Sequence, residues 1–179
     1  MRPGLLVIDA QNGWLEMSEG LKLSVQKTIP HIVEAIQVFR RAGAPILFTY
    51  HLYKEKGLYP GSKDFNLFPE IEIMPEDKRI IKTYQNAFNK TELGSLLKEQ
   101  GCDAVVLAGL SAMNCVLTTY YGAYDVDLSP YLLRGAVAGP DQTSIDLVEK
   151  ICDTLSIRAV NQILGGDQSV MVGHGVSKK

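Results

Sequence analysis

Three short apolar runs constrain the fold of this 179-residue chain more than any other feature. They are LLVID at Leu5–Asp9, PILFTY at Pro45–Tyr50 and AVVLA at Ala104–Ala108. None of them alternates apolar with polar residues, as a strand with one face in water does. Uninterrupted runs of this length are typical of strands buried on both faces, which occur in parallel sheets with helices on each side. The runs therefore predict the interior of such a sheet.

Segments with helical spacing and weaker strand patterns separate these runs. We predict four helices, at Pro30–Ala42, Thr91–Gln100, Cys115–Tyr124 and Asp141–Leu155. We predict three further strands, at Arg79–Thr83, Pro130–Arg134 and Ile157–Val160, and a mobile tail at Gly173–Lys179. Strands that alternate with helices predict an α/β fold, a three-layer α/β/α sandwich with a central, mostly parallel sheet. The length favours a single domain over residues 1–179.

Composition and charge narrow the class of partner. The chain is 46% hydrophobic and 21% charged, with a net charge of -2, which is typical of a soluble globular protein and argues against nucleic-acid or membrane-surface binding. No apolar stretch approaches the ~18 residues of a membrane span, and the first ten residues do not resemble a signal peptide. Three cysteines without CxxC pairing fit a reducing cytoplasm better than a disulfide framework or a structural zinc site.

Three chemically active side chains fall at the ends of predicted strands. Asp9 ends the first run, Lys82 lies at the end of Arg79–Thr83, and Cys115 follows the third run. Ligands of such sheets bind at the carboxyl ends of the strands, so we expect the three side chains to converge. Cys115 also begins a predicted helix, where free backbone N–H groups and the helix dipole stabilise a thiolate.

Residues 51–78 form the longest stretch without periodicity. Connections of this length are usually functional, so we expect a lid or a binding loop. Four aromatic residues at its start or within it either meet the substrate or anchor the loop or a neighbouring subunit, namely Tyr50, His51, Tyr53 and Tyr59.

Three blocks of sequence resemble the isochorismatase-like cysteine hydrolases, which include nicotinamidases and carbamoylsarcosine-type amidohydrolases. LLVIDAQNGW is similar to the opening strand of that superfamily, KTYQNAFNKTEL to its lysine block and AGLSAMNCVLTT to its nucleophile block. Each block alone is a weak signal, but the three occur in the expected order and span nearly the whole chain. The resemblance also implies a homo-oligomer that acts on a small molecule.

The resemblance implies a catalytic triad of Asp9, Lys82 and Cys115. Cys115 would attack an amide carbonyl, Asp9 would pass the thiol proton to the leaving amine, and water would hydrolyse the resulting thioester. Lys82 would hold the other two and stabilise negative charge. The backbone N–H groups of Ser111 and Cys115 would form the oxyanion hole, with a cis peptide between Leu110 and Ser111.

Departures from the family pattern bear on metal and substrate. Nicotinamidases carry a metal-binding Asp-x-His after the second strand, and the matching residues here are Thr49 and His51. A lone histidine is a poor transition-metal site, so we expect no catalytic metal and no cofactor. Ala112 replaces the usual threonine of the nucleophile turn, and Gly135 stands where many relatives have an aspartate after the fourth strand.

Several residues near these blocks are candidates for the substrate pocket. They are Gln11, Trp14, His51, Tyr84 and Phe88. The two remaining cysteines, Cys102 and Cys152, are interpreted as packing residues because they flank a strand and an apolar helix face. His31 and His174 are given no role.

The sequence leaves four functional hypotheses. The leading one is a metal-independent cysteine hydrolase of a small amide, imide or ureido compound, since isochorismatases proper typically lack the nucleophile. Alternatives are an isochorismatase- or nicotinamidase-type hydrolase and a catalytically altered member that serves as a binding or assembly module. A flavodoxin-like nucleotide binder ranks last because no GxGxxG or P-loop motif follows a strand.

Overall fold

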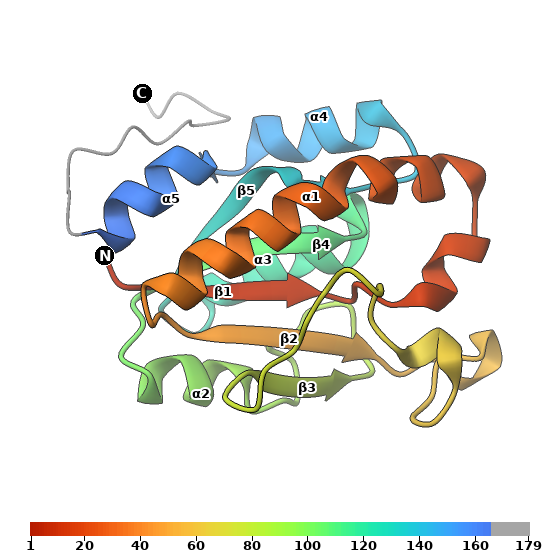
Figure 1. The fold of residues 1–179 in the computed structure, drawn as a ribbon, viewed down its shortest axis with the longest axis horizontal. Helices are drawn as coiled ribbons and strands as arrows, with labels where there is room; N and C mark the ends of the chain where they lie inside the picture. The colour runs from red at the N-terminus through yellow and green to blue at the C-terminus, as the bar shows by residue number, and fades with distance from the viewer. Residues whose placement is uncertain (166–179) are drawn as a thin grey trace.

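The structure is a computed structural model that describes residues 1–165, so His174 and the predicted tail at Gly173–Lys179 lie outside the described residues. Six strands form one parallel sheet in the order β3-β2-β1-β4-β5-β6. Their bounds are β1 Pro3–Ile8, β2 Ile46–His51, β3 Lys78–Lys82, β4 Ala104–Leu110, β5 Ser129–Ala138 and β6 Thr154–Leu155. The arrowheads of β1, β2 and β3 point the same way in Figure 1.

The central strand β1 has every residue buried, as its uninterrupted apolar run predicts. Successive side chains of a strand point to opposite faces of the sheet. Leu5 and Val7 accordingly belong to one core cluster, and Leu6 and Ile8 to the other. The lack of alternation in the sequence therefore reflects two separate cores that share one sheet.

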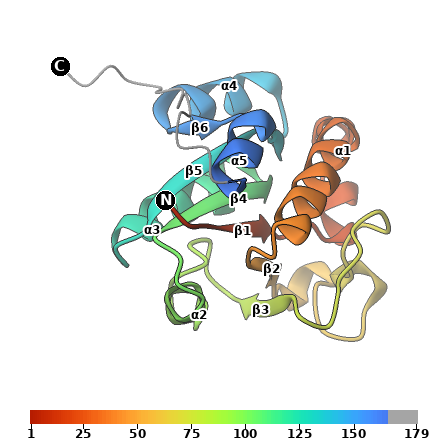
Figure 2. The same cartoon turned by 60° about the vertical axis from the view of Figure 1, so that its left-hand side comes forward.

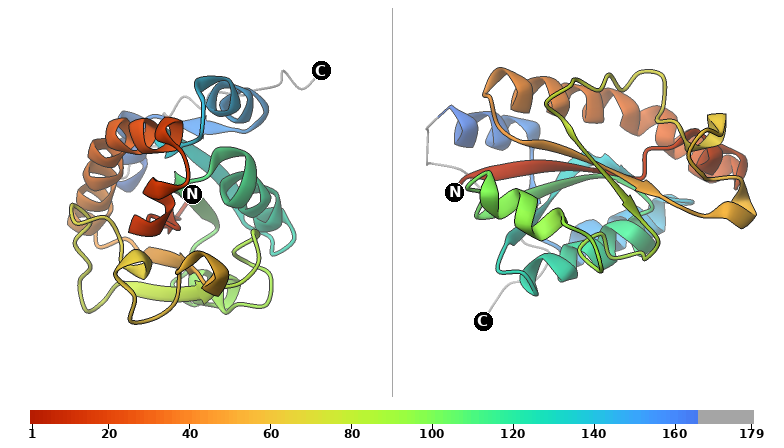
Figure 3. Two further views of the ribbon diagram at one scale, coloured as in Figure 1. Left: turned by 90° about the vertical axis from the view of Figure 1, so that its right-hand side faces the viewer. Right: turned by 90° about the horizontal axis from the view of Figure 1, so that it is seen from below.

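Helices cover both faces of the sheet. The first core cluster, which contains Leu5 and Val7, includes residues of α1 (Glu19–Arg41) and α5 (Ile157–Leu164). The second, which contains Leu6 and Ile8, includes residues of α2 (Leu93–Glu99), α3 (Leu117–Tyr124) and α4 (Gln142–Ile151). Figure 2 shows the span from β3 at one edge to β6 at the other, and Figure 3 shows helices above and below the sheet. The predicted three-layer sandwich is confirmed. Within residues 1–165, no helix is long and apolar enough to cross a membrane.

The strand order fixes where a site can form. From β1 the chain moves outward through β2 to β3, and then crosses to the other side of β1 to build β4 and β5. Such a reversal leaves a crevice beyond the carboxyl ends of the two strands that flank it, here β1 and β4. Asp9 directly follows β1, and Cys115 lies five residues beyond the end of β4.

The first helix differs from the prediction in where it begins. It starts at Glu19 rather than Pro30, after Ser18, whose hydroxyl accepts a hydrogen bond from the Leu21 N–H. Pro30 therefore lies inside α1, at a typical cost of ~3 kcal/mol. The extension buries Leu21 and Val25 on the first core face, and each such side chain contributes roughly 1.5–3 kcal/mol. Together these burials offset the cost of an internal proline.

The carboxyl-terminal elements differ in part from the prediction. The helix predicted over Asp141–Leu155 ends at Ile151, and Leu155 belongs to strand β6. The strand predicted over Ile157–Val160 is instead the first half of α5. Its β-branched residues suggest a strand, but the Ser156 hydroxyl caps a helix by accepting from the Ala159 N–H. Helical spacing then places Val160, Ile163 and Leu164 against the first core cluster.

Candidate active site

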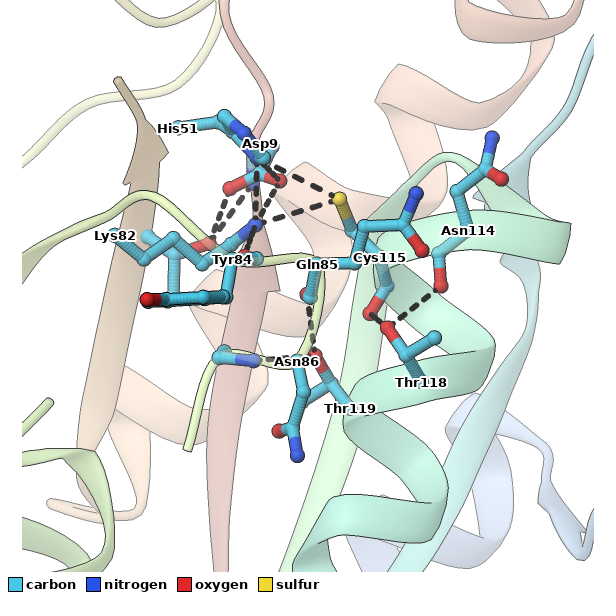
Figure 4. A network of polar contacts seen from close by, with 12 residues as sticks. Asp9, His51, Lys82, Tyr84, Gln85, Asn86, Asn114, Cys115, Thr118 and Thr119 are labelled. Atoms are coloured by element: carbon cyan, nitrogen blue, oxygen red, sulfur yellow. Dashed lines mark hydrogen bonds and ion pairs between the residues drawn. The ribbon is translucent and has the colours of Figure 1, made fainter. Parts of the chain in front are cut away.

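Four side chains meet beyond the carboxyl ends of four neighbouring strands (Figure 4). Asp9 follows β1, His51 ends β2, Lys82 ends β3, and Cys115 follows β4. The sequence predicts the convergence of Asp9, Lys82 and Cys115, and the structure brings these three together. His51 joins them directly, although the sequence indicates it only as a pocket contact.

The turn that carries Cys115 has an unusual backbone. Gly109 has a φ of 115°, and a Cβ at this position would collide with the backbone carbonyl of Ile8. The peptide between Leu110 and Ser111 is cis, as predicted. A π-helical turn, Ala112–Val116, then leads into α3 and carries the thiol. Glycine at position 109 is therefore what allows β4 to pass close to β1 as it enters this turn.

The Lys82 ammonium lies at the centre of the cluster. Its Nζ is 2.6 Å from Asp9 Oδ2, 3.0 Å from His51 Nδ1, 3.1 Å from the Tyr84 carbonyl oxygen and 3.3 Å from Cys115 Sγ. The Lys82 side chain has no exposed surface. An ammonium carries three hydrogens, and three of these neighbours accept hydrogen bonds, namely the Asp9 carboxylate, the Tyr84 carbonyl and the Cys115 sulfur. All the donor capacity of Lys82 is used within the protein.

Asp9 is a buried carboxylate with three partners. Thr49 Oγ1 donates to Asp9 Oδ1 over 2.6 Å, and the Asp9 N–H donates back to Thr49 Oγ1 over 3.1 Å. Burial raises the pKa of Asp9, but hydrogen bonding from His51 and the charge of Lys82 outweigh burial and leave it below its usual value. Asp9 is therefore ionised in the resting site.

Cys115 differs from the sequence-based expectation in its ionisation. Burial and the charge of Asp9 raise the pKa of the Cys115 thiol to about 12, and Lys82 offsets this only in part. Burial and the neighbouring carboxylate outweigh the stabilisation of the thiolate that is expected from the helix terminus. Cys115 is only 7% exposed. The resting residue is a thiol, so attack on a carbonyl requires a base that removes its proton.

The residues present do not fit a metal ion. Asp9, His51 and Cys115 each offer one ligand atom, and these atoms lie within 4.8 Å of one another. Lys82 Nζ, however, lies within 3.3 Å of all three of those atoms. Its ammonium occupies the position that a cation bound by the three would take, and it would repel such a cation. The Thr49 hydroxyl, at the position of the family's acidic ligand, is already bonded to Asp9.

A cavity of about 450 Å³ opens above Cys115. Asp9, His51 and Cys115 contribute to its wall. Uncharged polar residues line part of it, namely Ser18, Thr83, Gln85, Ser111 and Asn114. Apolar and aromatic residues line the rest, namely Trp14, Met17, Leu21, Tyr53, Leu110 and Pro140. The cavity suits a small molecule whose reacting group reaches the thiol.

The predicted pocket residues separate into two groups. Trp14 and His51 line the cavity, and their rings pack edge to face with centroids 5.8 Å apart. Gln11, Tyr84 and Phe88 do not line it. Tyr84 offers only its carbonyl to Lys82, and its hydroxyl accepts from Lys90, whereas Phe88 packs against the second core cluster.

Gln11 has a structural role instead. Its side-chain amide is fully buried and pairs with the backbone of His51, donating to the carbonyl over 3.3 Å and accepting from the N–H over 2.8 Å. It also donates to the Phe65 carbonyl. Gln11 thus holds the end of β2 and the following loop in place.

Sequence reasoning misses several lining residues and one partner of Asp9. Gln85 and Asn114 lie next to recognised blocks, but nothing in their spacing indicates which way their side chains point. The sequence marks Thr49 only as the position of a lost metal ligand. Cys102 and Cys152 pack in the second core cluster, as predicted.

Gly135 does not line the cavity around Cys115, although its place in the sequence suggests otherwise. It belongs to β5, where the pairing register with β4 shifts, and has a φ of 78°. It lines a separate cavity of about 440 Å³ together with His31. Glycine in place of the aspartate that the resemblance implies here therefore does not alter the wall of the cavity around Cys115.

Comparisons with known proteins agree with this geometry. A family model of the isochorismatase domain matches residues 3–155. The chain is 31% identical over 151 residues to a secreted isochorismatase effector of Verticillium dahliae, covering 82% of this chain and 78% of that protein. It is 29% identical over 143 residues to a probable inactive nicotinamidase of Arabidopsis thaliana, covering 69% and 73%. The crystal structure of N-carbamoylsarcosine amidase from Thermoplasma acidophilum matches with a TM-score of 0.73 and 26% identity, covering 84% of this chain and 92% of that one. The chain therefore belongs to the isochorismatase family of hydrolases.

Proposed function

We propose that this protein is a metal-independent cysteine hydrolase that cleaves the C–N bond of a small amide, imide or ureido compound. The observation that carries the proposal is the buried Lys82 ammonium within hydrogen-bonding distance of both the Asp9 carboxylate and the Cys115 thiol. A purely structural Lys82–Asp9 ion pair would not require the Cys115 thiol in contact with it or an open cavity beside it. Such a cluster in a cleft is a candidate site of catalysis.

In the proposed mechanism, Sγ of Cys115 forms a bond to the substrate carbonyl carbon while Asp9 accepts the thiol proton. The carbonyl oxygen becomes an oxyanion, for which the N–H groups of Ser111 and Cys115 are the proposed donors. Collapse of this intermediate breaks the C–N bond as Asp9 returns the proton to the leaving nitrogen. Water then attacks the thioester, Asp9 accepts its proton, and the thiol is regenerated with release of the acid.

Lys82 has a defined task in this scheme. Its ammonium lies close to both groups that change charge, so it stabilises the negative charge as it moves between Asp9 and Cys115. A proton transfer between a low-pKa acid and a high-pKa thiol is unfavourable in isolation. Coupling this transfer to carbonyl attack means that a free thiolate never has to accumulate.

Relatives support the reaction class without fixing the substrate. The structural relative from Thermoplasma acidophilum is an N-carbamoylsarcosine amidase, which is a C–N hydrolase by its name. The Arabidopsis relative is described as a probable inactive nicotinamidase, so loss of activity within the family is the main alternative. Retention of all three triad residues here favours the enzyme over the binding module.

An ammonia-release screen over small amides, imides and ureides tests the proposal. We expect at least one compound to be hydrolysed by the wild type and by Cys102→Ala, and by neither Cys115→Ala nor Lys82→Met. Cys102 is the matched control because it is a buried thiol outside the cavity. Turnover by Cys115→Ala at the wild-type rate would sink the mechanism, and the absence of turnover across the screen would favour a binding role.

A further inference from the structure

The charges around the Cys115 cavity limit what can bind there. Of the described residues that line it, Asp9 is the only acid, and none is a lysine or arginine. The nearest cation is Lys82, which lies beneath the cavity floor with no exposed surface. A carboxylate in this cavity would thus meet one negative charge and no exposed positive side chain.

Lys82 cannot serve as a hidden anion site. Its three N–H donors already face Asp9 Oδ2, the Tyr84 carbonyl and Cys115 Sγ. A substrate carboxylate would have to displace one of these partners while losing its own hydration. Burial of an anion without a compensating partner is strongly unfavourable.

The same wall is well suited to an uncharged amide. Gln85 and Asn114 are exposed in the cavity wall, and neither side-chain amide bonds to another residue of the part of the chain that the structure describes. Each offers two N–H donors and one carbonyl acceptor, the same groups that a primary amide or urea displays. Trp14, Leu21 and Leu110 supply apolar surface for the rest of the molecule.

From this arrangement we infer that the substrate is an uncharged amide, imide or urea, and that the cavity excludes compounds with a carboxylate next to the reacting carbonyl. The inference rests on the proposed function and specifies its substrate class. It separates this protein from hydrolases of carbamoylated amino acids, whose substrates carry a carboxylate close to the scissile bond.

A matched pair of alkylating reagents tests the charge preference without requiring turnover. Iodoacetamide and iodoacetate have the same electrophilic carbon and leaving group, and differ only in an amide or a carboxylate. The alkylation rate of Cys115 in the full-length protein is measured at pH 9 for each reagent by mass spectrometry of the labelled peptide. The ratio of the two rates is then divided by the same ratio for glutathione in the same buffer.

We expect Cys115 to favour iodoacetamide over iodoacetate at least about tenfold more than glutathione does, because the carboxylate finds no partner in the cavity. A ratio equal to or below that of glutathione overturns the inference, and so does labelling of Cys115 by iodoacetate but not by iodoacetamide. Gln85→Lys places a cation in the wall and should move the ratio towards iodoacetate, whereas the uncharged control Gln85→Met should not. An unchanged ratio in Gln85→Lys would also contradict the inference.

This experiment separates the two proposals. If no compound in the ammonia-release screen is hydrolysed, the proposed function fails while the alkylation ratio still reports the charge preference of the cavity. If hydrolysis is found only for carboxylate-bearing amides, the proposed function stands and the inference about the substrate class fails.

Discussion

Replacement of Lys82 by methionine should destabilise the protein strongly, because it leaves the buried carboxylate of Asp9 without its positively charged partner. Methionine keeps the length of the aliphatic side chain but removes the ammonium that pairs with Asp9 at 2.6 Å. Asp9 is 1% exposed, so water cannot replace the lost partner. Removal of one partner of a buried ion pair typically costs about 3–5 kcal/mol. For a domain of this size that corresponds to a fall in Tm of about 6–20 °C.

The penalty should depend on pH in a defined direction. In the wild type, burial raises the pKa of Asp9, but His51 and Lys82 hold it below its usual value of 3.8. The stabilisation by Asp9 is thus present above about pH 4 and is lost as the pH falls further. In Lys82→Met, the charge that lowers the pKa of Asp9 is gone, so burial should raise this pKa above its value in the unfolded chain. Stability of the variant should then fall as the pH rises, and the gap from the wild type should widen between pH 4 and pH 8.

Urea unfolding followed by circular dichroism at several pH values measures this gap. The double variant Asp9→Asn with Lys82→Met removes both charges, so it should be more stable than Lys82→Met alone at pH 8. The reasoning would be refuted by wild-type stability of Lys82→Met at pH 8. It would equally be refuted by a double variant no more stable than that single variant.

Three further predictions concern the surroundings of this pair. Thr49→Val removes the hydroxyl donor to Asp9, so the free energy of unfolding should fall by about 1–3 kcal/mol in urea titrations; an unchanged value would contradict the assigned hydrogen bond. Gly109→Ala should lower Tm sharply because its Cβ would collide with the Ile8 carbonyl at a φ of 115°. The control Gly43→Asn, at a left-handed position with open space, should keep Tm within a few degrees of wild type. Equal Tm values for the two variants would refute this. Dialysis against EDTA should leave amide hydrolysis unchanged, because an ammonium occupies the cation position, and loss of activity that zinc restores would overturn the metal-free assignment.

Much of the sheet is predictable because its signal is local. A run such as Leu5–Asp9 or Ala104–Ala108 needs no distant information to be identified as a strand buried on both faces. Residues at the carboxyl ends of parallel strands must share one edge of the sheet, so the positions of Asp9, Lys82 and Cys115 along the chain are enough to bring them together.

Elements whose form depends on tertiary packing are less predictable. Pro30 argues locally for a helix start, but burial of Leu21 and Val25 extends α1 back to Glu19. The short strand β6 and helix α5 also depend on what they pack against. Side-chain direction in turns is similarly non-local, which is why local sequence favours Gln11 and Tyr84 as cavity residues although they lie outside it.

The role of Gln11 has a consequence for how specificity can evolve in this fold. Within residues 1–165, its amide bonds only to main-chain groups, namely the N–H and carbonyl of His51 and the carbonyl of Phe65. Main-chain groups are present whatever side chains the loop carries, so exposed residues of the 52–77 segment can change without loss of this anchor, whereas Leu67, Phe68 and Ile71 are held in the first core cluster. Mutations there can reshape the mouth of the cavity around Tyr53 while the proton-transfer groups keep their positions. Substrate choice and chemistry are thereby open to independent selection.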